Sequence, residues 1–551
     1  MEIKRCIIMP EGIFKIPKPS NEVALSYAPK SKERAELKKM LSELRSKVIE
    51  IPLIINGEPV KTGNFGQCRC PHDHAHLLAK YHKASKDEAK AAIESALAAK
   101  ESWSNIEWSD RAAIFLKAAE LIAGPYRQKI NAATMLCQSK NPFQAEIDAG
   151  CELADFWRFS AYYMQNLYEQ QPDSPQGIWD RIQYRPLEGF VYAVTPFNFT
   201  AIGGNLPSAP AVMGNVVVWK PSSTAVYSNY FIMEILQEAG LPDGVINFMP
   251  GSASEIGKIP LLHPQLGGLH FTGSTETFRT MWKAIGENIY SYKTYPRIVG
   301  ETGGKNFVFV HHSADINEIT ASVIRGGFEY QGQKCAAVGR LYVPESRWKE
   351  LKDLLVKETK SIKTGTVENF ENFVNAVIDK AAFDKIASYI EFAKKSNDTE
   401  IIIGGGYDDS KGYFVEPTIL ITKDPKFKTM QEEIFGPVVT VYVYPDDKFE
   451  ETLTLCDQTS QYGLTGSIFA KDRRAIATAE RKLVNAAGNF YINDKPTGSV
   501  VGQQPFGGAR LSGTNDKSGS MANLLKWVSQ RTIKEVLLPI KDWRYPFMAE
   551  Q

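Results

Sequence analysis

Cys335, in the segment Gly-Gln-Lys-Cys-Ala, is the residue of this sequence that we assign to covalent chemistry. A thiol attacks a carbonyl carbon readily, and the thioester that it leaves can be cleaved by water. The same reaction needs preorganised donors for an oxyanion and a base for the water. Side chains of these types occur at Asn198, in Thr-Pro-Phe-Asn, and at Glu301, in Gly-Glu-Thr-Gly-Gly-Lys-Asn. The alternative for Cys335 is a buried structural cysteine, which is our interpretation of the other six.

The cysteine count and the charge balance narrow the class of protein. Seven is an odd number for a chain of 551 residues, which predicts no disulfide framework and favours a reducing compartment. With 64 Lys and Arg against 63 Asp and Glu, the chain lacks the basic excess of a nucleic-acid binder. The length predicts two or three domains. The cysteines are Cys6, Cys68, Cys70, Cys137, Cys151, Cys335 and Cys456.

Two segments, residues 1–10 and 189–219, are apolar enough to be compared with targeting or membrane segments. The apolar stretch within residues 1–10 is too short for a signal peptide, and it lacks the Arg and Ser of a transit peptide. We therefore predict a cytoplasmic location, or the mitochondrial matrix if the chain is eukaryotic. Residues 189–219 carry no charge and are long enough to span a bilayer, but prolines and asparagines interrupt them. This stretch predicts a buried site and no membrane span.

A parallel sheet is expected to position these residues. After a long helical N-terminal portion, with a capping-box pair at Ser85 and Glu88, β-branched runs start near residues 190, 216, 245 and 269. Segments of helical length, such as 227–239, separate these runs, which is typical of βαβ units. Ligands bind beyond the carboxyl ends of such strands, and Asn198, Lys220 and Gly273-Ser-Thr lie there. The last of these should open a helix whose free N–H groups hold a pyrophosphate.

Further strand and helix patterns follow Glu301. Strands are predicted at 307–310 and 341–343, with a helix near 322–327 between them. The segment 170–184 is predicted to leave the first domain. A strand after residue 528 is expected to be available for pairing with another chain.

Seven separated motifs agree in order and spacing with one family. The sequence resembles the aldehyde dehydrogenase superfamily over essentially its whole length, through the residues already quoted together with Glu433 in Glu-Glu-Ile-Phe-Gly-Pro and Phe506-Gly-Gly-Ala-Arg. The resemblance implies an α/β fold and a homodimer or higher homo-oligomer. The implied parts are a Rossmann-like NAD-binding domain (1–167 and 187–299), an α/β catalytic domain (300–515) and a small β oligomerisation element (168–186 and 516–551).

The resemblance also implies roles for individual residues. Asn198, with the Cys335 backbone N–H, corresponds to the oxyanion hole, and Glu301 corresponds to the general base. The alternatives are a turn asparagine that caps the next helix and a surface glutamate in a glycine-rich turn. The glycines around Glu301 instead suggest that the backbone there comes close to another group. The residues implied to contact NAD are Lys220, Ser223, Gly273, Ser274, Glu433 and Phe435.

The cofactor and the substrate each show a departure from the family pattern. Ser223 stands where many NAD-preferring members have an acid, so charge does not exclude NADP. Ala336 follows the nucleophile where a serine often bonds a substrate carboxylate. One such charge-assisted hydrogen bond is worth about 1.5–3 kcal/mol, which puts specificity in question unless backbone N–H groups compensate.

Several segments are similar to the branch that oxidises L-glutamate γ-semialdehyde, formed from 1-pyrroline-5-carboxylate, to L-glutamate in proline catabolism. They are residues 196–205, 489–495 and 497–517. The resemblance implies that Gly498 and Ser499 bind the α-carboxylate and that Phe199 and Phe506 flank the aliphatic chain. Another acidic semialdehyde, from succinate or aminoadipate, is the alternative substrate that Ala336 motivates. No proline dehydrogenase domain is evident, so that enzyme would be a separate chain.

A cysteine and histidine run offers a competing, non-enzymatic interpretation. Its members alternate at spacing two, so an extended strand would point them to one side, and thiolate and imidazole suit zinc. A proline interrupts the run, and no distant pair completes a usual zinc spacing. We therefore predict a solvent-facing hairpin rim and no metal site, with a catalytically silent metal-carrying protein as the rival. The run is Cys68, Cys70, His72, His74 and His76.

Overall fold

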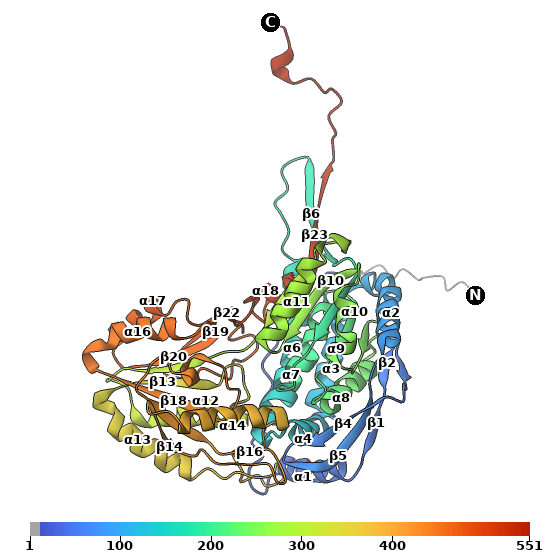
Figure 1. Cartoon of the computed structure of the whole chain (residues 1–551). Helices are drawn as coiled ribbons and strands as arrows, with labels where there is room; N and C mark the ends of the chain where they lie inside the picture. The colour runs from blue at the N-terminus through green and yellow to red at the C-terminus, as the bar shows by residue number, and fades with distance from the viewer. Residues whose placement is uncertain (1–11, 551) are drawn as a thin grey trace.

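The computed structural model describes residues 12–550. In this part of the chain two seven-stranded sheets, each packed between helices, form the two halves of the body, and a two-stranded ribbon projects from it (Figure 1). Cys6 and the segment considered as a signal peptide lie outside the described residues. The six described cysteines are all free, in agreement with the predicted absence of a disulfide framework.

The first sheet contains the predicted parallel strands. In the described chain its order is β11-β10-β7-β8-β9-β2-β3, and β7 to β11 run parallel. The predicted runs near 190, 216, 245 and 269 are confirmed as β7, β8, β9 and β10. These strands are β7 (Phe190–Val194), β8 (Val217–Lys220), β9 (Ile246–Phe248), β10 (Leu266–Thr272) and β11 (Arg297–Glu301). The helices between them are α7 (Thr200–Val212), α8 (Val226–Ala239), α9 (Ala253–Ile256), α10 (Lys258–Leu261), α11 (Thr275–Glu287) and η2 (Ile289–Ser291).

The prediction of a long helical N-terminal portion is only partly right. The capping box of Ser85 and Glu88 at α2 is confirmed, but residues 49–82 form strands. These runs are short. β2 and β3 pair with each other, and β2 joins the first sheet through the distant β9. The strands are β1 (Ile49–Ile51), β2 (Leu53–Ile55), β3 (Glu58–Val60), β4 (Phe65–Cys70) and β5 (Asp73–His82). The helices are α1 (Lys32–Arg45), α2 (Lys86–Ser104), α3 (Trp108–Ala123), α4 (Arg127–Gln138), α5 (Pro142–Ala145), the π-helix η1 (Glu146–Glu152) and α6 (Leu153–Tyr168).

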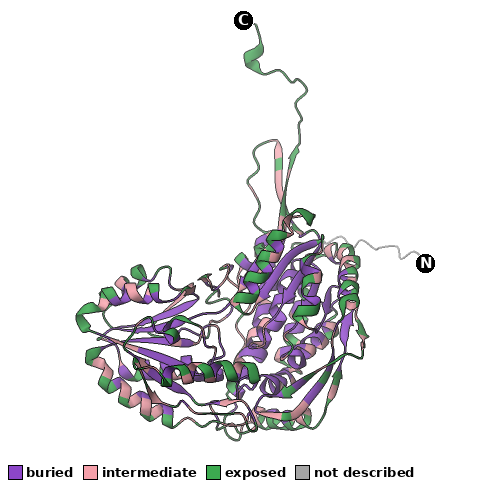
Figure 2. Ribbon diagram, viewed as in Figure 1, coloured by how far each residue is buried: buried purple, intermediate pink, exposed green. Residues whose placement is uncertain are grey.

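The charge-free stretch 189–219 is buried, as predicted. It comprises β7, α7 and β8, whose residues are almost all inaccessible (Figure 2). The helix α7 tolerates Pro207 and Pro210 within this packed environment. Within residues 12–550 no helix is long and apolar enough to cross a membrane.

The second sheet has the order β14-β17-β18-β13-β12-β20-β21 in the described chain. Side chains alternate across it, so Phe307 and Phe309 pack in one core and Val308 and Val310 in the other. Its strands are β12 (Asn306–Val310), β13 (Val338–Pro344), β14 (Thr399–Ile403), β17 (Thr418–Thr422), β18 (Val438–Tyr444), β20 (Thr465–Phe469) and β21 (Asn489–Ile492). Its helices are α12 (Ile316–Phe328), η3 (Glu329–Gly332), α13 (Glu345–Lys360), α14 (Lys380–Lys394), α15 (Lys428–Gln431), η4 (Asp446–Lys448), α16 (Phe449–Thr459) and α17 (Arg473–Lys482).

The ribbon pairs two segments that lie far apart in the sequence. Strand β6 (Ile178–Pro186) runs antiparallel to β23 (Val528–Val536) over its full length. The strand after residue 528 therefore pairs with its own chain. The remaining elements are β15 (Tyr407–Asp408), β16 (Phe414–Val415), β19 (Tyr462–Gly463), β22 (Ala509–Arg510), α18 (Met521–Leu525) and η5 (Pro546–Met548).

The chain passes from the first sheet to the second between Glu301, the last residue of β11, and Asn306, the first residue of β12. This point lies beside the predicted boundary between residues 299 and 300. The assignment of NAD binding to one half and catalysis to the other stays a prediction.

The cysteine and histidine run forms the β4–β5 hairpin, but the predicted solvent-facing rim is wrong for three of its members. Cys68, Cys70 and His72 are buried. The hairpin lies against the second half of the molecule, where the His72 Nε2 is 3.5 Å from Glu368 Oε2 and the His74 ring contacts the Asp409 carbonyl. Among the described residues no group of three or more His, Cys, Asp or Glu side chains is arranged to hold a metal ion.

Candidate active site

One cavity of about 370 Å³ brings predicted residues from both halves together. It contains the predicted thiol, the predicted base and every residue predicted to bind substrate. Asn198 and the residues predicted to contact NAD are not among those that line it. The predicted residues that line the cavity are Phe199, Glu301, Cys335, Ala336, Gly498, Ser499 and Phe506.

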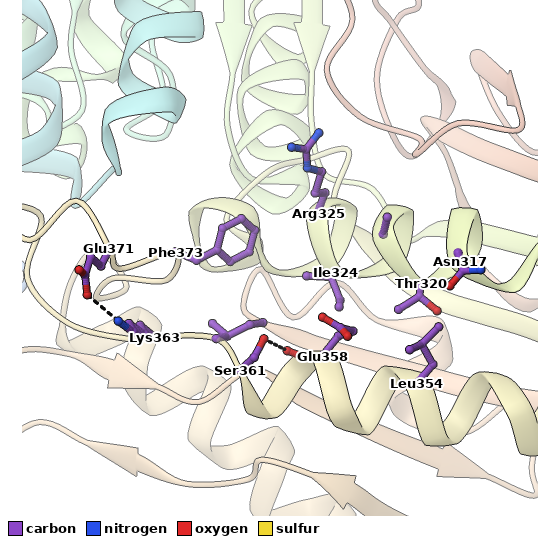
Figure 3. A pocket seen from close by; sticks show the side chains of 12 residues that line it. Asn317, Thr320, Ile324, Arg325, Leu354, Glu358, Ser361, Lys363, Glu371 and Phe373 are labelled. Atoms are coloured by element: carbon purple, nitrogen blue, oxygen red, sulfur yellow. Dashed lines mark hydrogen bonds and ion pairs between the residues drawn. The ribbon is translucent and has the colours of Figure 1, made fainter. Parts of the chain in front are cut away.

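A second hollow, of about 520 Å³, lies between α12 and α13 (Figure 3). Its polar side chains include Lys363 and Glu371, which form an ion pair with each other at 2.5 Å. No residue from the predicted site lines it. The chemistry is therefore assigned to the smaller cavity.

Cys335 lies in the segment between η3 and β13, and it is the only described cysteine that is partly exposed. The Asn306 side chain donates to the Cys335 carbonyl at 2.7 Å and to the Ala337 carbonyl at 2.8 Å. A Cβ on Gly304 would lie 2.3 Å from the Cys335 oxygen, so only glycine allows this approach. A Cβ on Gly303 would likewise meet the Glu433 carboxylate. The predicted close backbone approach at these glycines is confirmed.

The turn that leads to Cys335 is held in an unfavourable conformation. Tyr330 and Gln331 have φ values of 51° and 55°, which cost non-glycine residues about 1–3 kcal/mol each. The Gln331 side chain donates to the Ser139 and Ala376 carbonyls and accepts from the Asn375 N–H. These buried bonds fix the turn, and therefore the position of the thiol.

Asn198 does not cap the following helix, because α7 has Phe199 as its N-cap residue. The side chain of Asn198 instead donates to the Gln333 carbonyl at 3.1 Å, two residues before Cys335. Asp148, from the π-helix, accepts the Thr200 and Ala201 N–H groups in place of a cap. A buried ion pair with Lys140 holds Asp148. π-Helical turns occur often at functional sites.

Glu301 is the last residue of β11, and one of its carboxylate oxygens is buried without a hydrogen-bond partner among the described residues. Burial raises the pKa of the Glu301 carboxyl to about 8, Asp516 raises it further, and Lys517 opposes the shift. A carboxyl with this pKa is suited to accept and return a proton near neutral pH. The interpretation of Glu301 as a surface glutamate is wrong.

Burial also raises the pKa of the Cys335 thiol far above its ordinary value, and the carboxylates of Glu301 and Glu433 add to this effect. The thiol is therefore protonated at neutral pH. Attack by sulfur then requires a proton acceptor, and Glu301 lies in the same cavity.

Two residues predicted to contact NAD lie at the end of β8, Lys220 as its last residue and Ser223 just after it. The Lys220 ammonium is buried and makes one hydrogen bond, of 3.4 Å, to the Pro221 carbonyl. Burial lowers the pKa of Lys220 to about 8. No described residue forms an ion pair with it, so a polar ligand group would stabilise this cation. The side chain of Ser223 is exposed.

The other predicted NAD contacts come from two further segments. Ser274 is the N-cap of α11, as predicted, and leaves the first N–H groups of that helix for a phosphate. The Glu433 carboxylate accepts the Gly304 N–H at 2.8 Å. Phe435 has a φ of 61°, and its ring packs edge-on against Phe197, next to Asn198. An ammonium, a carboxylate and a helix N-terminus are the groups that ribose hydroxyls and a pyrophosphate require, so the donor set fits a dinucleotide.

The charged residues that line the cavity and were not predicted from the sequence include Glu152 and Lys495. Glu152 ends the π-helix, and burial raises its pKa to about 8, with Asp148 adding to the effect. The Lys495 ammonium lies 3.2 Å from the position of a Cβ on Gly498. Lys495 belongs to a segment that carried the resemblance, whereas no sequence pattern marked Glu152.

Comparisons with known proteins show which family and which solved structures this chain is similar to. A model of the aldehyde dehydrogenase family matches residues 61–533. The mitochondrial Δ1-pyrroline-5-carboxylate dehydrogenase of Dictyostelium discoideum is 52% identical over 538 residues, which cover 97% of this chain and 96% of the relative. The NAD-bound crystal structure of the Mycobacterium tuberculosis Δ-pyrroline-5-carboxylate dehydrogenase is 49% identical, with a TM-score of 0.95 over 98% and 100% of the two chains. Proline utilization A from Bdellovibrio bacteriovorus is 30% identical, with a TM-score of 0.91 over 96% of this chain and 54% of that one.

Proposed function

This chain belongs to the aldehyde dehydrogenase family, and we propose that it oxidises L-glutamate γ-semialdehyde to L-glutamate with NAD as the oxidant, in proline catabolism. The observation that carries the proposal is the single cavity in which the Cys335 thiol and the Glu301 carboxyl meet the loop of Gly498 and Ser499. Relatives that share about half of all residues over nearly the full length carry this activity in their names.

The residues of the cavity match the two ends of this substrate. Phe199 and Phe506 line it and flank the aliphatic chain, while Gly498 and Ser499 take the α-carboxylate. The Lys495 ammonium beside Gly498 supplies a positive charge that offsets the hydroxyl missing at Ala336. Glu152 has no ion-pair partner among the described residues, and its carboxylate takes the substrate ammonium.

The chemistry follows from the two titratable groups. The Cys335 sulfur forms a bond to the aldehyde carbon as its proton passes to Glu301, and the Asn198 amide with the Cys335 N–H stabilises the oxygen. Lys220, Ser274, Glu433 and Phe435 would hold NAD, which when bound would supply the acceptor for the hydride of the aldehyde carbon. Glu301 then releases this first proton to solvent. Water attacks the thioester as Glu301 takes a proton from it, and the carbon–sulfur bond breaks to release the acid as Glu301 returns that proton to the Cys335 sulfur.

Steady-state kinetics with several aldehydes test the proposal. We expect kcat/KM for L-glutamate γ-semialdehyde to exceed the values for succinate and aminoadipate semialdehydes by at least about tenfold, because succinate semialdehyde lacks the ammonium and aminoadipate semialdehyde has one more methylene between the charged carbon and the aldehyde. NAD is expected to be preferred to NADP, although Ser223 places no charge against a 2′-phosphate. A higher kcat/KM for another semialdehyde would identify that aldehyde as the substrate instead. Absence of NADH formation together with bound zinc would favour the metal-carrying alternative.

The projecting ribbon is proposed to join copies of this chain into a homodimer or larger oligomer. A two-stranded ribbon alone is marginally stable in water, and its outer edges are open to pairing. Figure 2 colours the tail, at the top of the view, as exposed and the ribbon as exposed or intermediate, and both carry large apolar side chains that are exposed. These side chains are Trp179, Leu537, Leu538, Ile540, Trp543, Tyr545 and Phe547.

The oligomer is tested by light scattering after size exclusion. We expect the parent chain to be at least dimeric, and a variant with Trp179→Ser, Leu538→Ser and Ile540→Ser to be monomeric, because each change removes apolar area from the contact. The matched control replaces Val48 and Val484 by serine, since both side chains are exposed and belong to neither the ribbon nor the tail. A monomeric parent, or equal shifts in both variants, would contradict the proposal.

The cellular setting is also a proposal. We place the chain in a reducing compartment, the cytoplasm or, for a eukaryotic source, the mitochondrial matrix. The relative from Dictyostelium is named as mitochondrial. The likeness to part of proline utilization A supports a functional link to a proline dehydrogenase on a separate chain.

A further inference from the structure

Residues 16–27, which we call the N-terminal strap, form neither helix nor strand and yet are firmly attached. The Ile16 N–H donates to the Gln165 side chain, and the Leu25 N–H donates to the Glu146 carboxylate at 2.7 Å. The Tyr27 hydroxyl donates to the same carboxylate at 2.7 Å. Hydrogen bonds therefore replace regular structure in fixing the course of this segment.

The middle of the strap forms part of the wall of the active-site cavity. Asn21, Glu22 and Ala24 line it, beside Asp155 of α6. The Glu22 carboxylate lies 2.8 Å from the Arg127 guanidinium and 2.7 Å from that of Arg158. Its own N–H donates to Asp155 at 2.8 Å. The strap is thus held at the cavity by charge as well as by backbone bonds.

Asn21 joins the strap to the loop 497–504, which carries Gly498 and Ser499. Its side-chain amide donates to Asp155 Oδ2 at 2.9 Å and to the Val501 carbonyl at 2.7 Å. Its side-chain oxygen accepts from Gln503 Nε2 at 2.8 Å. Asn21 therefore bonds to the loop at Val501 and at Gln503, and through Asp155 it links the loop to α6.

The remaining hydrogen bonds of the loop are mostly local. The Gln503 and Gln504 N–H groups donate to the Val500 carbonyl, and Ser499 shares a bond with Tyr491 of β21. Among the described residues, the hydrogen bonds that attach the loop to the first half of the molecule all pass through Asn21. Val501 also packs in the hydrophobic core of the first half, so Asn21 supplies the polar part of this attachment.

We infer that Asn21 is a positioning residue for the substrate carboxylate, and that the strap sets the selectivity of the enzyme for aldehydes with a carboxylate at the far end. The inference rests on the proposed function, because it takes the loop 497–504 as the carboxylate site. Asn21 acts through the loop rather than on the reacting atoms. Its loss is therefore expected to affect the binding of the charged end and to leave the chemistry at Cys335 intact.

The test compares a charged with an uncharged aldehyde in the Asn21→Ala variant. We expect KM for L-glutamate γ-semialdehyde to rise about tenfold or more, with kcat within about twofold of the parent, because hydrogen bonds that place the loop are lost. KM for propionaldehyde, which has no carboxylate, is expected to stay unchanged. Gln503→Ala removes one of the three bonds and should give a smaller rise in the same KM.

The control is Asn369→Ala, an exposed asparagine whose side chain bonds only within its own turn. Equal KM changes for both aldehydes in the Asn21→Ala variant, or no change for the semialdehyde, would overturn the inference. If Asn21→Ala does not fold, the Gln503→Ala variant decides in the same way. A parent enzyme without preference for the semialdehyde over propionaldehyde would contradict the proposed function instead.

Discussion

A Cys335→Ala variant is expected to lose aldehyde-dependent NADH formation by at least about 10⁴-fold. Without sulfur no covalent adduct forms, and no other described cysteine can replace it, because the rest are buried. The measurement is the initial rate of NADH appearance at saturating aldehyde and NAD. Binding of NAD, followed by calorimetry, should be unchanged within about twofold, because alanine leaves the Asn306 bonds to the backbone in place.

Cys151→Ala is the matched control for this variant. Cys151 lines the same cavity, but its sulfur lies against Arg127 and Glu146 and burial raises its pKa to about 12. We expect its activity to stay within a few-fold of the parent. Full activity in Cys335→Ala, or an equal loss in both variants, would remove Cys335 from the role of nucleophile.

Replacement of Glu301 by glutamine is expected to lower kcat by about 10² to 10⁴-fold, the usual contribution of a positioned base. Glutamine keeps the shape of the side chain but cannot accept a proton. The exposed Glu345→Gln, in the first turn of α13, serves as the control and should match the parent. A loss of less than about tenfold in Glu301→Gln would assign the base to another group.

The pH dependence of kcat gives an independent check on Glu301. Because burial raises its pKa to about 8, the carboxyl is mostly protonated at pH 7 and becomes a base as the pH rises through 8. We therefore expect the kcat of the parent to increase between pH 6 and 9 with an inflection near 8, and this inflection to vanish in Glu301→Gln. An unchanged inflection in the variant would assign it to a different residue.

The parts of the site that lie at the ends of regular strands could be predicted from the sequence. Lys220 ends β8 and Ser274 caps α11, and both positions follow from strand and helix patterns. The glycine pair before Lys305 was expected to allow a close approach, and the structure identifies the partners as Glu433 and the Cys335 backbone. Local patterns place a residue on an element, but they do not reveal which distant atom it meets.

The parts that could not be predicted come from irregular segments or from very short strands. Asn21 lies in a segment without periodicity, and Glu152 lies in a π-helix whose pattern differs from that of an α-helix. The strands β2 and β3 have three residues each and exist because β9 lies beside β2. In each case tertiary contacts decide the structure, and a single sequence does not carry them.

The bonds between Asn21 and the loop 497–504 impose an order on the biosynthesis of the enzyme. Asn21 and Val501 are 480 positions apart, so on the order of half a minute or more passes between their synthesis on a ribosome. In that interval the reactive thiol and its base are already made, while the wall that recognises the carboxylate is incomplete. The wall that recognises the carboxylate is thus completed only after both groups of the chemistry have been synthesised.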